Sequence, residues 1–160
     1  HRSDILNPGA MTVKRVAEKP ISSSSVIKVK WQDGFRFVAV DDRGHSVAMD
    51  TSEEHGGQDS AFSPMQLLLA ALGGCTGMDV VNVLQKQRQK LTDLEIVVSG
   101  ERVSEHPKVY STVHVEYKLK GENLKDKAVR TAIQLSVDKY CSVGATIGKT
   151  AKMSHSYVLQ

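Results

Sequence analysis

Long uninterrupted hydrophobic runs are absent from this sequence of 160 residues. A helix that crosses a membrane needs roughly 18–20 consecutive apolar residues, and we therefore expect no membrane association. The beginning of the chain is polar and lacks the apolar core of a secretory signal. Both features predict a cytoplasmic protein.

A strong charge of either sign is also lacking, because 21 Lys and Arg stand against 18 Asp and Glu, a net charge of +3. The nearest thing to a basic cluster, residues 86–90, ends a predicted helix, where cations complement the helix dipole. Aromatic residues do not alternate with basic ones, as they do on many nucleic-acid-binding surfaces. We therefore expect no nucleic-acid partner.

Glycine-rich nucleotide-binding motifs and C-x-x-C pairs are missing as well. None of the six histidines repeats at the spacing of metal ligands. The sequence therefore predicts neither a nucleotide cofactor nor a metal site.

Two cysteines are present, and each lies among small residues in an apolar stretch. Cys75 belongs to Leu-Gly-Gly-Cys-Thr-Gly, and Cys141 belongs to Lys-Tyr-Cys-Ser-Val-Gly. A resting disulfide is unusual in the cytosol, whereas a transient catalytic one is not. If the fold brings the two cysteines together, one thiol can attack an oxidant and the other can close a disulfide.

The sequence leaves two other interpretations of the cysteines open. Each can be a small hydrophobic residue packed in the core. A cysteine hydrolase is also conceivable, with a histidine base from elsewhere in the chain. The candidates for that base are His55, His114 and His155. Asp79, one helical turn after Cys75, would raise the pKa of the thiol if it faces it.

The chain divides into three segments by composition. We predict an expression leader at residues 1–10, a flexible serine-rich segment at 11–25, and a single domain at 26–160. Within the domain we expect strands at 26–31, 35–40 and 45–50, an apolar helix from Ser63-Pro64 to about 84, a hairpin of 92–103 and 109–119, a helix over 123–140, and a strand over 151–159.

This order of elements predicts an α+β fold in which curved antiparallel sheets pack around two core helices. The first helix is apolar on almost all sides, so it belongs in the middle of a core. Its glycines at 73, 74 and 77 indicate either close approach of another helix or a break that starts a second helix at Cys75.

Two segments resemble a known family. Residues 63–81, S-P-M-Q-L-L-L-A-A-L-G-G-C-T-G-M-D-V-V, resemble the signature helix of the OsmC/Ohr family, and residues 132–147 around Cys141 resemble its second cysteine segment. The strand order agrees over most of residues 26–160. The form Gly-Gly-Cys-Thr-Gly-x-Asp-Val-Val is most similar to the YhfA-like branch.

The resemblance implies an OsmC-like intertwined homodimer whose active sites lie at the subunit interface. It also implies a stress-response antioxidant enzyme, a thiol peroxidase that reduces organic hydroperoxides bound in an apolar pocket. In that mechanism Cys75 attacks the peroxide and Cys141 resolves the product. No bound cofactor is implied, and an external dithiol supplies the electrons.

The sequence departs from the peroxidases of this family at two points. Met65 stands where they place a glutamate, and their thiolate-stabilising arginine has no counterpart in a matching motif. The early strands contain only Arg36 and Arg43. These departures motivate an alternative function, a non-enzymatic dimeric module that binds an apolar small molecule or senses oxidation with the same pocket.

Overall fold

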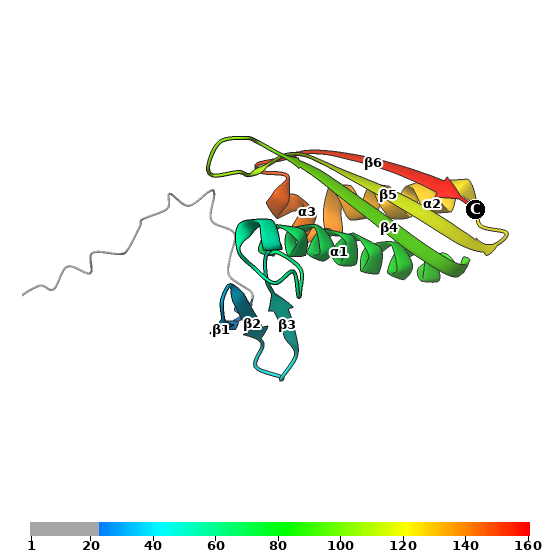
Figure 1. Ribbon diagram of the computed structural model, residues 1–160. Helices are drawn as coiled ribbons and strands as arrows, with labels where there is room; N and C mark the ends of the chain where they lie inside the picture. Colours follow the sequence, from blue (N-terminus) through cyan, green and yellow to red (C-terminus); the bar gives the residue numbers. More distant parts are fainter. Residues whose placement is uncertain (1–22) are drawn as a thin grey trace, which may run out of the picture.

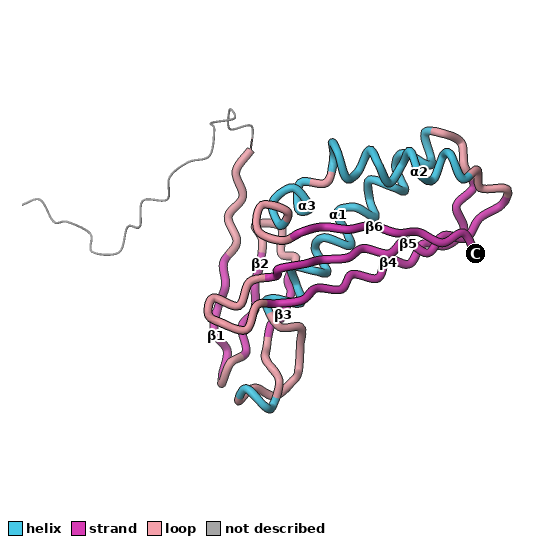
Figure 2. The backbone as a smooth tube through the Cα atoms, turned by 90° about the horizontal axis from the view of Figure 1, so that it is seen from above, coloured by secondary structure: helices cyan, strands magenta, loops and turns pink. Residues whose placement is uncertain are grey.

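The computed structural model describes residues 23–160, so the predicted leader at 1–10 and residues 11–22 lie outside the described part. The first three strands form a small antiparallel sheet, as predicted, in the order β1 (Lys28–Asp33), β2 (Arg36–Val40) and β3 (Ser46–Met49). Figures 1 and 2 show this sheet projecting from one end of the main body. We call residues 26–50 the arm.

Helix α1 (Pro64–Lys86) begins at the predicted place because two reciprocal hydrogen bonds cap its N-terminus. The Ser63 hydroxyl accepts the Gln66 backbone N–H at 3.2 Å, and the Gln66 side chain accepts the Ser63 N–H at 2.9 Å. This reciprocal pair is a capping box. Proline at the first helical position adds a backbone angle that already suits the helix.

The glycines of α1 do not break the helix, which runs without interruption through Cys75. They permit close approach of a strand rather than of another helix. A Cβ atom at Gly73 would lie 3.2 Å from a methyl of Val98, and one at Gly77 would lie 2.9 Å from Ile96 Cδ1. The short side chains therefore let β4 (Lys90–Arg102) pack directly onto α1.

By length and composition alone, α1 is apolar enough to cross a membrane. The same property is found in helices at the centre of folded domains, but in the single subunit only one face of α1 is buried, so the expectation of a helix covered on all sides is not met. In this structure α1 packs against β4 and against the C-terminal helices. Its buried side chains include Leu72, Val80 and Leu84, which join the main hydrophobic core.

The second sheet has the order β4, β5 (Tyr110–Glu122), β6 (Lys152–Leu159). The β4–β5 hairpin confirms the prediction, and every second residue of β5 from Val113 to Leu119 is buried in the core. The all-antiparallel expectation is wrong for β6, which pairs with β5 in parallel. The helices between them form a crossover, which a parallel pair requires.

The crossover consists of α2 (Asp126–Leu135), a π-helical turn η2 (Ser136–Tyr140) and the short helix α3 (Ser142–Ile147). The predicted helix over 123–140 is therefore present, but it starts three residues later and ends in a widened turn. Figure 1 shows α1 and the crossover helices on the same side of the second sheet. The core lies between them, and Cys141 falls between η2 and α3.

Candidate functional site: a thiol pair beside a buried hydroxyl chain

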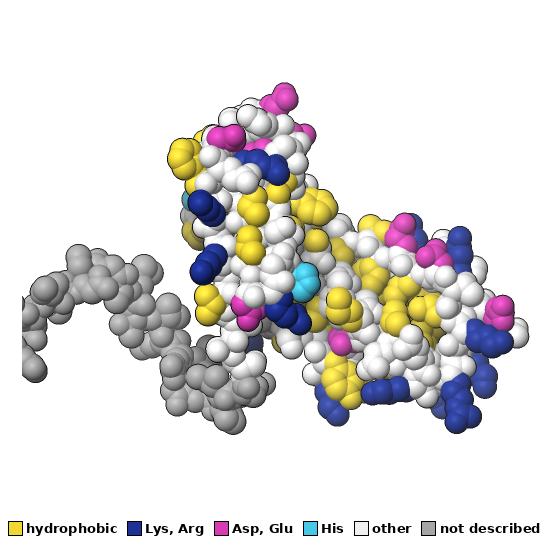
Figure 3. All heavy atoms as spheres, turned by 90° about the horizontal axis from the view of Figure 1, so that it is seen from below, with side chains coloured by type: hydrophobic (Ala, Val, Ile, Leu, Met, Phe, Trp, Pro, Cys, Tyr) yellow, Lys and Arg dark blue, Asp and Glu magenta, His cyan; other side chains and the backbone are white. Residues whose placement is uncertain are grey.

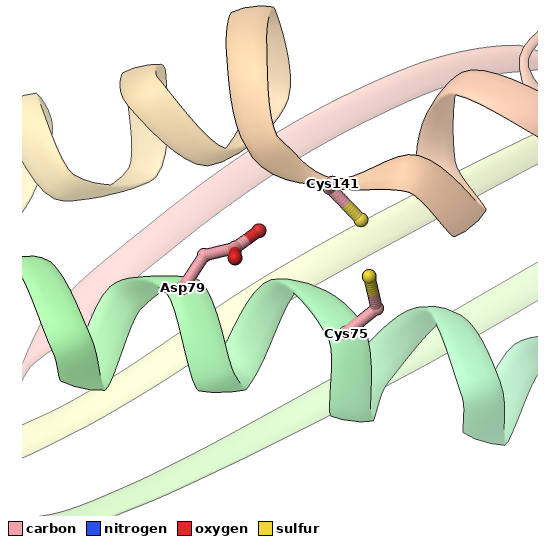
Figure 4. Close-up of side chains that lie close together, drawn as sticks. All are labelled: Cys75, Asp79 and Cys141. Atoms are coloured by element: carbon pink, nitrogen blue, oxygen red, sulfur yellow. The ribbon is translucent and has the colours of Figure 1, made fainter. Parts of the chain in front are cut away.

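The structure brings the two cysteines together. Cys75 projects from the middle of α1 and Cys141 from the junction of η2 and α3, and in Figure 4 their sulfurs point toward each other. Both are free thiols, and the two Sγ atoms lie within 4.8 Å of each other. Cys75 is partly exposed, whereas Cys141 is buried with 7% of its surface accessible.

The π turn places Cys141 where it faces α1. The Cys141 backbone N–H donates to the Ser136 carbonyl at 2.8 Å, which closes the wide turn. Cys141 then adopts an extended conformation and caps α3, with its sulfur accepting the Gly144 N–H at 3.3 Å. The local backbone therefore holds both the sulfur and the Ser136 side chain toward α1.

Burial dominates the acidity of the Cys141 thiol and raises its pKa to about 11. The Gly144 N–H favours the thiolate, but the neighbouring Cys75 side chain and the negative charge of Asp79 oppose it. Cys141 is therefore a neutral thiol at physiological pH.

Asp79 forms the third member of this cluster, because it follows Cys75 by one helical turn. Its carboxylate lies within 4.8 Å of both sulfurs, and Figure 4 shows it beside the thiol pair. The Ser136 hydroxyl donates to Asp79 Oδ2 at 2.9 Å. Asp79 therefore faces the Cys75 sulfur, an orientation that the sequence left open.

A chain of buried hydroxyl groups leads away from Asp79. Thr76 Oγ1 lies 2.7 Å from Ser136 Oγ and 2.7 Å from the Tyr117 hydroxyl. The Tyr117 hydroxyl in turn lies 3.3 Å from His155 Nδ1. Thr76, Ser136 and Tyr117 are almost completely buried, and we call these three side chains the hydroxyl chain.

Burial also sets the protonation of the two rings at the far end of this chain. It raises the pKa of the Tyr117 phenol, and it lowers the pKa of His155, to which the charge of His114 contributes. Tyr117 is therefore a neutral phenol and His155 a neutral imidazole at physiological pH. The rings stack with centroids 6.1 Å apart.

A small cavity of about 80 Å³ adjoins Cys141 and His155, with apolar walls from Leu72, Val137 and Met153. Larger clefts of about 430 and 630 Å³ run along α1 beside β4, where Gly73 and Gly74 contribute to both.

Of the three histidines considered as bases, the structure brings only His155 to the thiol site. His55 bonds the Ser52 hydroxyl in the loop after the arm, and His114 bonds Ser154 and Ser156 on the outer face of the second sheet.

The structure shows what Met65 and Arg36, the residues behind the two departures from the peroxidase pattern, contact. The Met65 side chain packs against the core, and its carbonyl accepts the Tyr110 hydroxyl at 2.7 Å. Arg36 bonds Gln32 and Ser60, which belong to the arm and the loop after it. Neither residue takes part in the thiol cluster within this subunit.

The thiol cluster has a donor set that suits a thiophilic metal ion. Cys75, Asp79 and Cys141 are the one group of three such ligands found within residues 23–160. The expectation of no metal site rested on local spacing, which cannot detect a group whose third member, Cys141, comes from a distant segment.

A long central helix thus bears one cysteine, packs against a mixed sheet and faces a second cysteine from the crossover. The chain belongs to the OsmC-like protein family, whose profile matches residues 57–156.

Relatives cover most of the chain. It is 39% identical over 130 residues to protein YhfA of Escherichia coli. The aligned residues cover 81% of this chain and 94% of YhfA. A crystal structure of a protein from Aquifex aeolicus is 28% identical with a TM-score of 0.76, covering 86% of this chain and 97% of the other. The organic hydroperoxide resistance protein OsmC of Legionella pneumophila has the same fold at 16% identity, with a TM-score of 0.63 and coverage of 86% and 98%.

Proposed function

We propose that this protein reduces organic hydroperoxides by a two-cysteine cycle. The observation that carries the proposal is the pairing of Cys75 and Cys141, the only cysteines of the chain, with sulfurs within 4.8 Å. Their different exposure suggests their roles. Cys75 is partly accessible and meets the oxidant, whereas the buried Cys141 acts from within the fold.

In the first step the Cys75 sulfur attacks the terminal oxygen of the hydroperoxide. The O–O bond breaks, Cys75 becomes a sulfenic acid, and the alkoxide leaves and takes up the thiol proton to become an alcohol. In the second step Cys141 attacks the Cys75 sulfur, a disulfide forms, and water leaves. An external dithiol then reduces the disulfide and is itself oxidised.

The family supports this chemistry in general terms. The Legionella relative is an organic hydroperoxide resistance protein. At its low sequence identity the likeness shows a shared fold, and we propose the activity for this chain on that basis. A reducing cytoplasm, where we propose the protein acts, would supply the dithiol.

We also propose that the active form is a homodimer. The arm exposes Trp31, Phe35 and Phe37, and α1 exposes Met78 with 75% of its surface accessible. Figure 3 shows hydrophobic side chains gathered on the face of the main body seen from below. Apolar surface of this extent marks an interaction site, and a second copy would cover it while its arm closes the clefts along α1.

The test is consumption of cumene hydroperoxide by the reduced protein with dithiothreitol as donor. Wild type should turn over, and Cys75→Ser should not. Cys141→Ser is the matched control, because it keeps the attacking thiol and should consume hydroperoxide without forming the intramolecular disulfide. Full turnover by Cys75→Ser would contradict the proposal.

Specific observations favour a redox sensor as a second candidate function. The charge of the Asp79 carboxylate disfavours a thiolate at Cys141, and Arg36 bonds Gln32 and Ser60 instead of a thiol within the subunit. A sensor would form the Cys75–Cys141 disulfide once per hydroperoxide, and dithiols would reduce that disulfide too slowly for multiple turnover. Single-turnover and multiple-turnover measurements on the same preparation separate the two functions.

A further inference from the structure

The direction of every hydrogen bond in the hydroxyl chain follows from counting hydrogens. Each hydroxyl group has one hydrogen to donate. Ser136 donates its hydrogen to Asp79, so Thr76 must donate to Ser136. Tyr117 must then donate to Thr76, because the hydrogen of Thr76 is already used.

The same count fixes the tautomer of His155. The Tyr117 hydrogen points to Thr76, so the contact of 3.3 Å with His155 requires that Nδ1 carry the hydrogen. All donors therefore point the same way, from His155 through the hydroxyl chain to the Asp79 carboxylate. A chain ordered in this way can pass a proton toward Asp79 if every group hands its hydrogen to the next.

Opening the Cys75–Cys141 disulfide creates a need for such a proton. When an external thiolate attacks the accessible Cys75 sulfur, the S–S bond breaks and Cys141 leaves with the electron pair. A thiolate of high pKa is a poor leaving group, and burial makes the Cys141 thiolate costly. A proton donor beside the Cys141 sulfur would remove that cost.

We infer that the hydroxyl chain delivers a proton from His155 to Asp79, which passes it to the Cys141 sulfur as the disulfide opens. The inference rests on the thiol–disulfide half of the proposed cycle. Asp79 lies within 4.8 Å of that sulfur, a separation that a single water molecule can bridge. Asp79 is thus the catalytic acid, and Thr76, Ser136 and Tyr117 are positioning residues that supply it.

The proton balance closes at both ends. His155 takes a proton from solvent at Nε2 and gives up its Nδ1 hydrogen to Tyr117, so the ring changes tautomer and gains no charge. Each hydroxyl group receives one hydrogen and passes one on. Asp79 receives a proton from Ser136 and transfers it to the Cys141 thiolate, so its own charge is restored.

Other titratable groups lie near the two ends of this path. Lys86 and Tyr140 line a cavity of about 290 Å³ with Asp79. His114 acts on His155 through its charge. Neither Lys86 nor Tyr140 is hydrogen-bonded to the Asp79 carboxylate. Among the described residues, Ser136 is therefore the side chain that donates to it.

Thr76→Val and Thr76→Ser form a matched pair for the test. Valine keeps the shape of threonine and interrupts the chain, whereas serine keeps the hydroxyl group. The disulfide is formed with diamide, and its reduction by dithiothreitol is followed by acid quench and mass spectrometry. We expect Thr76→Val to be reduced at least about tenfold more slowly, and Thr76→Ser to stay near wild type.

A proton inventory separates proton delivery from a structural role. The rate of disulfide reduction in mixtures of H₂O and D₂O should curve with deuterium content for wild type and Thr76→Ser, and should be linear for Thr76→Val. Asp79→Asn is the second variant if Thr76→Val does not fold, since asparagine can still accept from Ser136 but cannot hand on a proton. It should also be reduced slowly.

The outcomes distinguish this inference from the proposed function. Reduction of both variants at the wild-type rate overturns the proton path, whatever the hydroperoxide assay gives. Slow reduction of Thr76→Val with a linear inventory supports the path even if wild type fails to consume hydroperoxide. The use of diamide makes the test independent of the peroxide step.

Discussion

Asp79 follows Cys75 by one turn of α1, and both side chains face Cys141 within 4.8 Å. This places a negative charge beside two thiols, which is the reverse of the cationic surroundings that activate most reactive cysteines. The arrangement suits the opening and closing of a disulfide, where a thiolate must gain or lose a proton. It gives the buried thiol a partner for proton exchange.

The two thiols should differ strongly in reactivity toward iodoacetamide. At neutral pH we expect one alkylation per reduced, folded chain, at the partly exposed Cys75. Cys141 should react only after unfolding, because it is buried and its pKa is about 11. Mass spectrometry of wild type and Cys75→Ser measures this, and rapid labelling of folded Cys75→Ser would contradict it.

The Cys141→Ser variant should trap the oxidised form of Cys75. Without its partner thiol, the sulfenic acid formed by a hydroperoxide cannot close the disulfide and should persist. Dimedone should therefore label this variant stoichiometrically and label wild type only weakly. Cys75→Ser is the negative control. Equal labelling of wild type and Cys141→Ser would show that Cys141 does not resolve the sulfenic acid.

Features with local causes could be predicted from the sequence. The start of α1 follows from Ser63 and Pro64, and the hairpin follows from the alternation in β5, so both predictions are confirmed. The parallel pairing of β6 depends on the path of the crossover, which no local pattern specifies. The π turn before Cys141 likewise has no sequence signal that we recognise.

The contacts within the hydroxyl chain could not be predicted from the sequence either. The periodicity assigns Ser136 to the inner stripe of its helix and Tyr117 to the buried face of its strand. A polar group at such a position needs a partner, and that need could have been a signal. Which groups meet depends on the packing of α1 between the sheet and the crossover, and this cannot be derived from spacing.

Gly100 should be sensitive to the smallest substitution. A Cβ atom there would lie 2.6 Å from the ring of Tyr110, whose hydroxyl donates to the Met65 carbonyl. Gly100→Ala must displace the ring and should lower the free energy of unfolding by about 1–3 kcal/mol. Tyr110→Phe, which removes only the hydrogen bond, should cost about 0.5–1.5 kcal/mol. Urea denaturation measures both, and an unchanged Gly100→Ala midpoint would contradict the expected clash.

The proposed dimer should depend on the exposed face of α1. Met78 has 75% of its surface accessible in the single subunit, and a charge there would be buried at the interface. We expect Met78→Glu to shift the protein to monomers in light scattering after gel filtration. Val158→Glu, on the outer face of β6, is the matched control and should leave the dimer intact. Dissociation by both substitutions, or by neither, would exclude an interface centred on α1.

Asp50 should make the loop after the arm sensitive to acid. Its carboxylate accepts hydrogen bonds from the Ser60 hydroxyl and from the backbone of Thr51, Gln58 and Ser60. The bond from the Ser60 side chain contributes most, and together these bonds lower the pKa of Asp50 from 3.8 to about 2.

The sign of the effect follows from the lowered pKa. A carboxylate with a lower pKa in the folded state stabilises fully above its unfolded pKa and loses that contribution as the pH falls toward the folded value. Asp50→Asn should therefore reduce stability at neutral pH, and its difference from wild type should shrink as the pH falls from 3.8 toward about 2. Asp59→Asn in the same loop is the control, because Asp59 is exposed and its difference from wild type should stay small throughout. Urea midpoints measured across this range decide the matter, and an Asp50→Asn difference that does not change with pH would rule out the hydrogen bonds as the cause.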